Sequence, residues 1–181
     1  MIRAAALVSG DGALLQTVLD SMYFGEIPNF ELTAVICTES DAYALRRARN
    51  SGVEAFVVEP SLFPTKLSYS MAISNKLRDM DIDLVILAGY NMPLGVISTQ
   101  FRKRIIGVYP VSYTHLRAHE TLDGNIGAII AQQAVDILPN DTPESLSRRI
   151  LEDAEWKLLP QAISLYCQGR LEIHGDRVVI K

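Results

Sequence analysis

The sequence predicts one α/β domain: a mostly parallel, twisted sheet with helices on both faces, followed by a long C-terminal helix and a hairpin. Short apolar runs rich in β-branched residues alternate with segments of helical period over the first 110 residues. These runs are continuously apolar, which indicates strands buried on both faces, as in a parallel sheet. A length of 181 residues, with 49% hydrophobic and 21% charged residues, suits one globular domain with a sizeable core.

The first part of the chain divides regularly into expected strands and helices. Leu14, Leu15 and Val18 have helical spacing, and the residues at 38–41 offer N-cap side chains for a second helix. The expected strands cover residues 3–9, 32–37, 55–58, 84–88 and 105–109, and the expected helices cover residues 13–22, 42–50, 66–80 and 94–104.

The last part of the chain resumes the same pattern. Residues 128–137 predict a long strand. Thr142 is expected to cap a long helix that has Pro143 at its first position. Two short runs, residues 171–173 and 178–180, flank a Gly-Asp turn and predict the terminal hairpin.

Between these parts lies a segment of a different character. Residues 111–121 have no clear strand or helix period and include His115 and His119. These histidines could face one metal ion if the segment were helical, but no cysteine or acidic pair accompanies them, so we expect no metal. We therefore expect one domain over residues 1–181, interrupted at about 111–124 by an anomalous segment.

Composition narrows the class of protein. A net charge of −4 argues against a broad nucleic-acid surface. We expect no membrane partner, because no apolar run is long enough to span a bilayer. Cys37 and Cys167 lie far apart in apolar patterns, which favours two buried free thiols in a reducing cytoplasm over a disulfide. The oligomeric state is left open.

The turn at residues 9–12, Ser-Gly-Asp-Gly, joins the first expected strand to the first expected helix. Such a turn offers backbone N–H groups and a positive helix end, which suit a phosphate. It is not a dinucleotide-binding GxGxxG motif, because Leu15 stands where the third glycine would be. A structural tight turn and a phosphate site are both consistent with the local sequence.

A second loop follows the expected central strand, at residues 87–94. Ligands of open α/β sheets bind at the carboxyl ends of strands, so Tyr90, Met92 and Leu94 could receive a flat ring system. The same residues could equally pack as an apolar corner of the core. Glu155, on the last helix, would by itself be a solvated surface acid.

Several short motifs occur in a fixed order along the chain. They are Ser9-Gly10-Asp11-Gly12 with Leu15-Gln16, Thr38-Glu39-Ser40-Asp41-Ala42 with Ala48-Arg49, Leu87-Ala88-Gly89-Tyr90, residues 105–110, Ile129-Ile130-Ala131-Gln132, Asp141-Thr142-Pro143-Glu144, Ala154-Glu155-Trp156-Lys157-Leu158-Leu159-Pro160 and Gly169-Arg170-Leu171. Together they resemble the phosphoribosylglycinamide formyltransferase family, folate-dependent enzymes of purine synthesis. The likeness covers residues 2–110 and about 125–181, and it implies the α/β fold of that family.

The resemblance implies transfer of a formyl group from the co-substrate 10-formyltetrahydrofolate to the amine of glycinamide ribonucleotide, in de novo purine synthesis in the cytoplasm. The partners implied are these small molecules alone. The ribonucleotide phosphate would lie on Gly12, Ala13 and Leu14, and Glu155 falls on the acid that meets the substrate amine. Where the family usually has a small polar residue and Asn, Ala13 and Leu14 keep only backbone donors.

The folate site implied by the resemblance lies in the loop after the fourth strand. The pterin ring would be held by Tyr90 and by residues 91–94, which are Asn91, Met92, Pro93 and Leu94. Lys66 falls where the family often has an Arg near the folate.

The catalytic positions depart from the family motif Asn-x-His-Pro. The matching positions hold Gly107 and Tyr109, and the family's Asp falls on Asn125 or, with a two-residue shift, on Asp123. Glycine has no side-chain donor for the developing oxyanion, which costs roughly 10²–10³ in rate. A tyrosine, with a reference pKa of about 10, shuttles protons poorly at neutral pH, and losing general acid–base help costs about 10²–10⁴. We therefore expect a very poor formyltransferase with a degenerate active site.

The anomalous segment bears on both activity and stability. It resembles a peptide obtained by translating sequencing-adapter DNA, and the interval there is about twenty residues shorter than in the family. We expect the loss of an internal strand, an exposed sheet edge and an aggregation-prone product. Two alternatives to an enzyme remain open: a non-catalytic ligand-binding relative of the formyltransferases, and a generic nucleotide-binding domain, which the missing GxGxxG disfavours.

Overall fold

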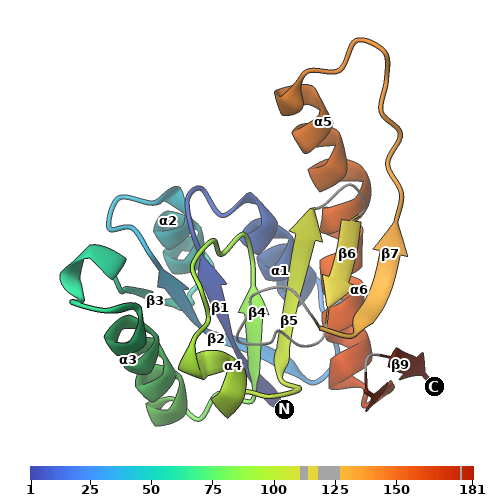
Figure 1. Cartoon of the computed structure of the whole chain (residues 1–181). Helices are drawn as coiled ribbons and strands as arrows, with labels where there is room; N and C mark the ends of the chain where they lie inside the picture. Colours follow the sequence, from blue (N-terminus) through green and yellow to red (C-terminus); the bar gives the residue numbers. More distant parts are fainter. Residues whose placement is uncertain (111–113, 118–126, 176) are drawn as a thin grey trace.

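The fold is described from a computed structural model of the chain, which gives residues 1–110, 114–117, 127–175 and 177–181, with the backbone alone for residues 109, 110 and 114–117. The described residues form one sheet of nine strands in the order β3-β2-β1-β4-β5-β6-β7-β9-β8 (Figure 1). The strands are β1 (Ile2–Val8), β2 (Phe30–Cys37), β3 (Glu54–Val57), β4 (Leu84–Leu87), β5 (Ile105–Pro110), β6 (Thr114–Arg117), β7 (Ile129–Gln133), β8 (Leu171–His174) and β9 (Arg177–Ile180). The helices are α1 (Ala13–Tyr23), α2 (Tyr43–Asn50), the short 3₁₀ turn η1 (Pro60–Leu62), α3 (Lys66–Asp79), α4 (Val96–Gln100), α5 (Pro143–Ile150), the π turn η2 (Leu151–Glu155) and α6 (Trp156–Cys167).

The central part of the sheet is parallel, as expected. Strand β1 pairs in parallel with β2 and β4, β2 pairs with β3, and β4 pairs with β5. The two strands of the terminal hairpin, β8 and β9, pair antiparallel, and β9 joins the sheet beside β7. The predicted fold class is therefore confirmed, with the carboxyl ends of β1, β2, β4 and β5 at one edge of the sheet.

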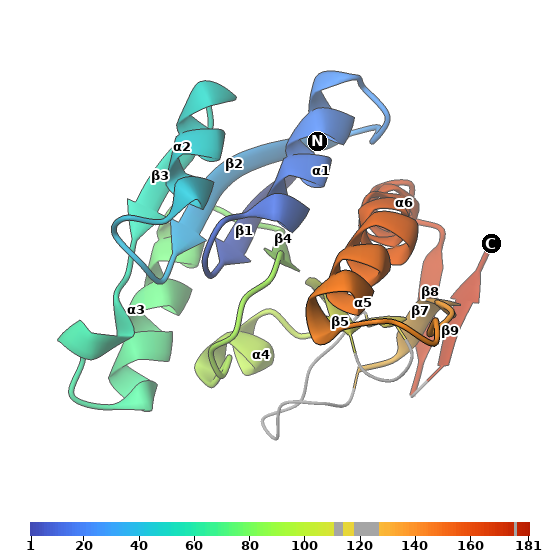
Figure 2. The same cartoon turned by 90° about the horizontal axis from the view of Figure 1, so that it is seen from above.

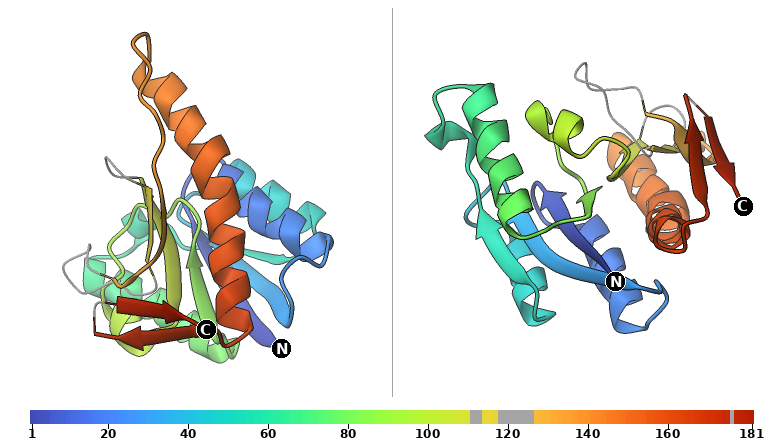
Figure 3. Two further views of the ribbon diagram at one scale, coloured as in Figure 1. Left: turned by 90° about the vertical axis from the view of Figure 1, so that its right-hand side faces the viewer. Right: turned by 90° about the horizontal axis from the view of Figure 1, so that it is seen from below.

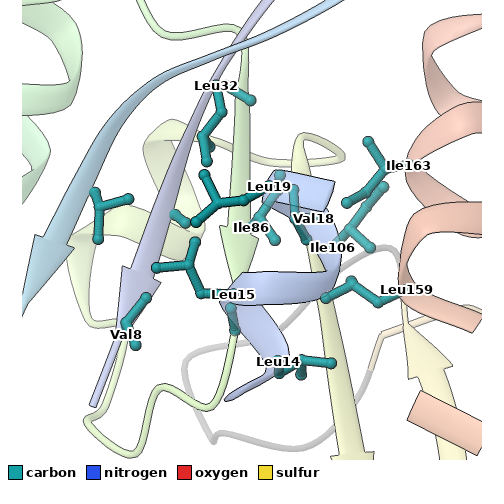
Figure 4. Close-up of a cluster of buried hydrophobic side chains, with 14 of the residues drawn as sticks. Val8, Leu14, Leu15, Val18, Leu19, Leu32, Ile86, Ile106, Leu159 and Ile163 are labelled. Atoms are coloured by element: carbon teal, nitrogen blue, oxygen red, sulfur yellow. The ribbon is translucent and has the colours of Figure 1, made fainter. Parts of the chain in front are cut away.

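Alternate residues of the central strands face two separate cores. On one face Ala4, Ala6 and Val8 of β1 pack with α1, α2 and α6; Figure 4 shows part of this cluster. On the other face Ala5 and Leu7 pack with α3, α4 and the residues around them. Figure 2 shows the same two helical layers from above. A strand covered on both sides has no polar face, which explains the continuous apolar runs in the sequence.

The expectation that the sheet lacks an internal strand is wrong. Within the anomalous segment, Thr114–Arg117 forms β6, which pairs antiparallel with β5 and with β7. Its four residues are too few to show a recognisable strand period, and the strand is defined by its pairing with the preceding β5 on one side and with β7 on the other. The edge of β5 is therefore covered rather than exposed.

Two elements are shorter than predicted. Helix α4 covers only Val96–Gln100 instead of residues 94–104, because Gly95 (φ 52°) precedes it and Lys103 (φ 62°) is left-handed. Strand β7 ends at Gln133 instead of residue 137, because its ladder with the short β6 ends where Thr114 pairs with Gln133.

The C-terminal helix is long and includes a π turn. Helix α5 begins with the predicted cap, in which the Thr142 hydroxyl accepts the Ser145 N–H, and continues through η2 into α6. Figures 1 and 3 show α5 rising beyond the sheet, with the connection from β7 alongside it. Arg149 ties the two together by paired contacts of 2.6 Å to the Asp141 carboxylate.

Candidate functional site

The first part of the candidate site is a hydrogen-bonded cluster at the carboxyl edge of the sheet. Ser9 follows β1, Thr38 follows β2 and Gly89 follows β4, and these strands are neighbours. The Ser9 N–H donates to the Gly89 carbonyl at 3.3 Å, and the Thr38 N–H donates to the Val8 carbonyl at 3.2 Å. The two loops singled out from the sequence therefore lie side by side, where α/β folds bind ligands.

Glycine at position 12 is required by the packing of this edge. Gly12 is the N-cap of α1 and has a left-handed φ of 72°. A Cβ there would lie 2.8 Å from the Cβ and 2.9 Å from the Cα of Ala44 in α2. Helix α2 thus packs closely against the turn and fixes the position at which α1 begins.

The start of α1 presents backbone donors beside a cation. The first N–H groups of a helix have no partner within the helix, and here the Asp11 carboxylate accepts the Ala13 N–H at 3.0 Å. The Leu14 side chain is buried in the core (Figure 4), so this residue offers a ligand only its backbone. The Arg47 guanidinium donates to the Asp11 carbonyl at 3.0 Å, and its positive charge favours an anion at the turn.

The loop after β4 is fixed at its middle and at its end. The Tyr90 hydroxyl donates to the buried Tyr69 hydroxyl at 3.1 Å, and Tyr69 packs edge-on against Phe63. At the end of the loop, a Cβ on Gly95 would lie 2.5 Å from Ser70 Oγ of α3, so only glycine fits. These contacts hold the loop in one defined conformation.

The apolar residues of the loop after β4 divide between the two interpretations that the sequence left open, a ligand site and a packed corner of the core. The side chain of Leu94 is buried in the core, as the packing interpretation expected. Tyr90 and Met92 are half-buried and pack against the same core, while Asn91 and Pro93 are exposed. Lys66 is exposed at the first position of α3, where a cation gains nothing from the helix dipole.

Glu155 is buried, which corrects the expectation of a solvated surface acid. It is 8% exposed, and burial raises the pKa of its carboxyl group. It ends the π turn η2, whose Asp153 carbonyl accepts a 2.7 Å hydrogen bond from the Gln133 side chain. Because Gln133 ends β7, which runs parallel to β5, the π turn lies at the carboxyl edge, and π turns of this kind often mark functional sites.

The catalytic positions are described only in part. Gly107 is buried in β5, where a Cβ would lie 3.0 Å from the Leu87 Cβ. Of Tyr109 only the backbone is described, paired with His115 of β6. Asp123 and Asn125, the two candidates for the acidic position, lie outside the described residues, as does His119.

Sequence reasoning missed three side chains that organise the site. Tyr69 was not singled out, and Ser9 was considered only as part of a turn. Thr38 was considered only among the N-cap candidates at 38–41, and that expectation is wrong, because the N-cap of α2 is Ala42 with no side-chain hydrogen bond. The signal available for Ser9 was its place directly after the first strand. The signal for Tyr69 was a polar aromatic residue on the apolar face of its helix.

Two hollows elsewhere in the described part of the chain do not include the two loops of the candidate site. A groove of about 510 Å³ beside the C-terminal end of α1 and α6 includes Glu26, Trp156 and Arg170, away from the two loops. A smaller hollow of about 250 Å³ at the ends of β2 and β3 is lined by Thr38, Asp41 and other polar residues. Over the described ranges we find no group of three or more metal-ligating side chains and no helix able to span a membrane.

Comparison with known proteins shows that this chain is similar to formyl transferases. A family model for formyl transferases matches residues 2–112. The chain is 32% identical over 199 residues to the phosphoribosylglycinamide formyltransferase of Haemophilus influenzae, covering 97% of this chain and 92% of that protein. The chain belongs to the phosphoribosylglycinamide formyltransferase family.

Solved structures agree with this assignment. Glycinamide ribonucleotide transformylase 1 from Symbiobacterium toebii superposes with a TM-score of 0.93 at 36% identity, covering 99% of this chain and 94% of that one. The phosphoribosylglycinamide formyltransferase of Coxiella burnetii gives a TM-score of 0.87 at 25% identity, covering 99% and 93%. The alignment with the Haemophilus protein runs over 199 positions against 181 residues here, so that relative carries residues with no counterpart in this chain.

Proposed function

We propose that this chain binds glycinamide ribonucleotide and a reduced folate side by side, and that its catalysis of formyl transfer between them is impaired. The observation that carries the binding proposal is the direct link between the two loops through Ser9 and Gly89. The ribonucleotide phosphate would take the start of α1, at Gly12, Ala13 and Leu14, where it would displace the Asp11 carboxylate from the Ala13 N–H. The pterin would take the loop from Tyr90 to Leu94.

The reaction of the family sets what the chain must supply. The substrate amine attacks the formyl carbon, a new C–N bond forms, and the bond to N10 of the folate breaks as N10 takes a proton. The oxyanion of the tetrahedral intermediate needs a donor, and the proton needs a carrier. We assign Glu155 to the amine, because a buried carboxyl of raised pKa can accept a hydrogen bond or exchange a proton there.

The proposal that catalysis is impaired rests on two residues of strand β5. Gly107 offers no side-chain donor, and Tyr109 stands in place of the family's histidine. The tight fit of position 107 against Leu87 means that a larger side chain would require this neighbour to shift. The identities of Gly107 and Tyr109 favour the second candidate, a non-catalytic relative that keeps both ligand sites. Asp123 or Asn125 would complete the catalytic group, and which of them does so stays a proposal.

Binding and turnover are tested separately on the full chain. Titration calorimetry with glycinamide ribonucleotide, and then with tetrahydrofolate, is expected to show saturable binding of both. A single-turnover assay with 10-formyltetrahydrofolate, monitored by release of tetrahydrofolate, then distinguishes an enzyme from a binding protein. Failure to bind either ligand would refute the proposed function.

The anomalous segment needs its own test. We propose that residues 111–124 interrupt the family domain and replace an active-site stretch. Sequencing the gene from source DNA across codons 100 to 130 is expected to show a longer interval containing the family histidine. If the same codons return, the interruption belongs to the natural protein and the chain is a degenerate family member.

A further inference from the structure

The Ser9 hydroxyl makes three hydrogen bonds at the point where three strand ends meet. It donates to Asn91 Oδ1 at 2.8 Å, and it accepts from the Thr38 hydroxyl at 3.1 Å and from the Asn91 N–H at 3.4 Å. A serine hydroxyl has one proton to donate and two lone pairs to accept with. Its hydrogen-bonding capacity is therefore fully used, which leaves it one orientation.

This arrangement decides what Asn91 can offer a ligand. An asparagine side chain has one carbonyl acceptor and two N–H donors. The Ser9 hydroxyl occupies the carbonyl Oδ1, while the residue itself is exposed at the loop surface. Both Nδ2–H donors are left for a ligand, whereas Ser9 takes one of the two lone pairs of Oδ1, so the free hydrogen-bonding capacity of this side chain is mainly that of a donor.

We propose that Ser9 is a positioning residue that holds Asn91 as a hydrogen-bond donor, so that this loop selects a ring bearing an acceptor. The inference rests on the proposed function and specifies its folate subsite. A pterin ring carries a carbonyl oxygen and ring nitrogens that accept such bonds. An analogue in which those acceptors are replaced by C–H would lose the contact.

The fixed position of Asn91 follows from its neighbours as well as from Ser9. The preceding residues are held by the Gly89 carbonyl on the Ser9 N–H and by the Tyr90 hydroxyl on Tyr69. The backbone of the loop keeps these two contacts when the Ser9 hydroxyl is removed, although the Asn91 N–H loses its acceptor at 3.4 Å. Both groups that lose a partner in the loop belong to Asn91, so the effect of Ser9 on a ligand should pass through Asn91.

The test is a double-mutant cycle on the full chain with tetrahydrofolate as the probe. Ser9→Ala and Asn91→Ala are each expected to weaken binding by about tenfold, the equivalent of one hydrogen bond. The double variant should be no weaker than Asn91→Ala alone, because Ser9 acts through Asn91. Ser9→Thr keeps the hydroxyl and should restore most of the affinity.

Two further variants test separately the role of the Thr38 hydroxyl and the need for hydrogen-bond donors on residue 91. Thr38→Val removes the other partner of Ser9 and should leave the dissociation constant within about twofold, a level usual for a site not in contact with the ligand. Asn91→Asp keeps the acceptor for Ser9 but replaces the donors, and should weaken binding about tenfold even at about 0.5 M salt, where long-range repulsion is screened.

The outcomes are distinguishable. If the wild-type chain binds tetrahydrofolate but Ser9→Ala or Asn91→Asp leaves the affinity unchanged, the inference is wrong while the proposed function stands. If the effects of Ser9→Ala and Asn91→Ala simply add, Ser9 does not act through Asn91 and the inference is again wrong. If the wild-type chain does not bind the probe at all, both the inference and the proposed function fall.

Discussion

The parts of the sheet before and after β5 differ in how well they match the chemistry of the family. Before β5, strands β1, β2 and β4 bring together the two loops that we propose as ligand sites, with Gly12 and Gly95 fitted to their neighbours. From β5 onward, the positions that we propose for the family's catalytic residues hold Gly107 and Tyr109, and the internal strand β6 comes from a segment unlike the rest. A sheet can therefore be completed by backbone pairing alone, whereas catalysis needs particular side chains at particular ends of strands.

The largest expected effect is on turnover. We expect the single-turnover rate constant to lie roughly 10⁴-fold or more below that of the Haemophilus influenzae relative, because under the proposed assignment Gly107 and Tyr109 stand in place of the oxyanion donor and the proton carrier. Both proteins would be assayed with saturating glycinamide ribonucleotide and 10-formyltetrahydrofolate. A rate constant within about tenfold of that of the relative would show that the sheet from β5 onward keeps the catalytic chemistry of the family.

The next largest effect concerns the turn before α1. Gly12→Ala should lower the free energy of unfolding by about 2 kcal/mol or more, because a left-handed alanine costs about 1–2 kcal/mol and the new Cβ also overlaps Ala44. Gly10→Ala is the matched control, since Gly10 also has a positive φ, of 81°, but open space around it. Urea unfolding of both variants measures the difference. Equal losses would show that α2 does not press on the turn.

Sequence reasoning succeeded where burial is continuous and failed where contacts are distant. The central strands were predictable because a strand covered on both faces must be apolar throughout. Strand β6 was not predictable for a different reason: Thr114–Arg117 has no strand period of its own and is held by pairing with the preceding β5 and with β7. The bond between Ser9 and Asn91 joins residues 82 positions apart, and nothing local to either residue indicates it.

Glu155 shows the same limit within a helix. Its neighbours Glu152 and Asp153 are exposed, so the local sequence indicates a polar surface. The π turn inserts an extra residue into the helix and changes which side chains face the core. Glu155 was judged from the sequence by its residue type, although it lies four residues before the buried Leu159 and eight before the buried Ile163, a helical spacing that indicates the apolar face.

A smaller effect is expected from the charge of Glu155. Burial raises the pKa of this carboxyl above its unfolded value, so its contribution to stability is fully present below the usual Glu range and is lost as pH rises through the raised value. Glu155→Gln mimics the protonated form, so it should raise the melting temperature at neutral pH and leave it unchanged near pH 4. Thermal melts across this range measure the effect.

The exposed Glu152→Gln is the matched control for that experiment and should show no such pH dependence. Ribonucleotide affinity gives an independent readout, and it should fall in Glu155→Gln if the carboxylate meets the substrate amine. A Glu155→Gln protein that is less stable than the wild type at neutral pH would mean that ionised Glu155 has a favourable partner in the fold.

The smallest expected effect is the reactivity of the two cysteines, which report on the two parts of the molecule. Cys37 ends β2, and Cys167 ends α6; both are free and buried. Burial raises the pKa of both thiols, that of Cys167 to about 11, so little of the reactive thiolate forms at neutral pH. Iodoacetamide followed by mass spectrometry should find both unmodified until the chain is unfolded. If Cys167 alone is alkylated, α6 separates from a sheet that keeps Cys37 covered. That result would show the part after β5 to be the less stable one, as the anomalous segment led us to expect.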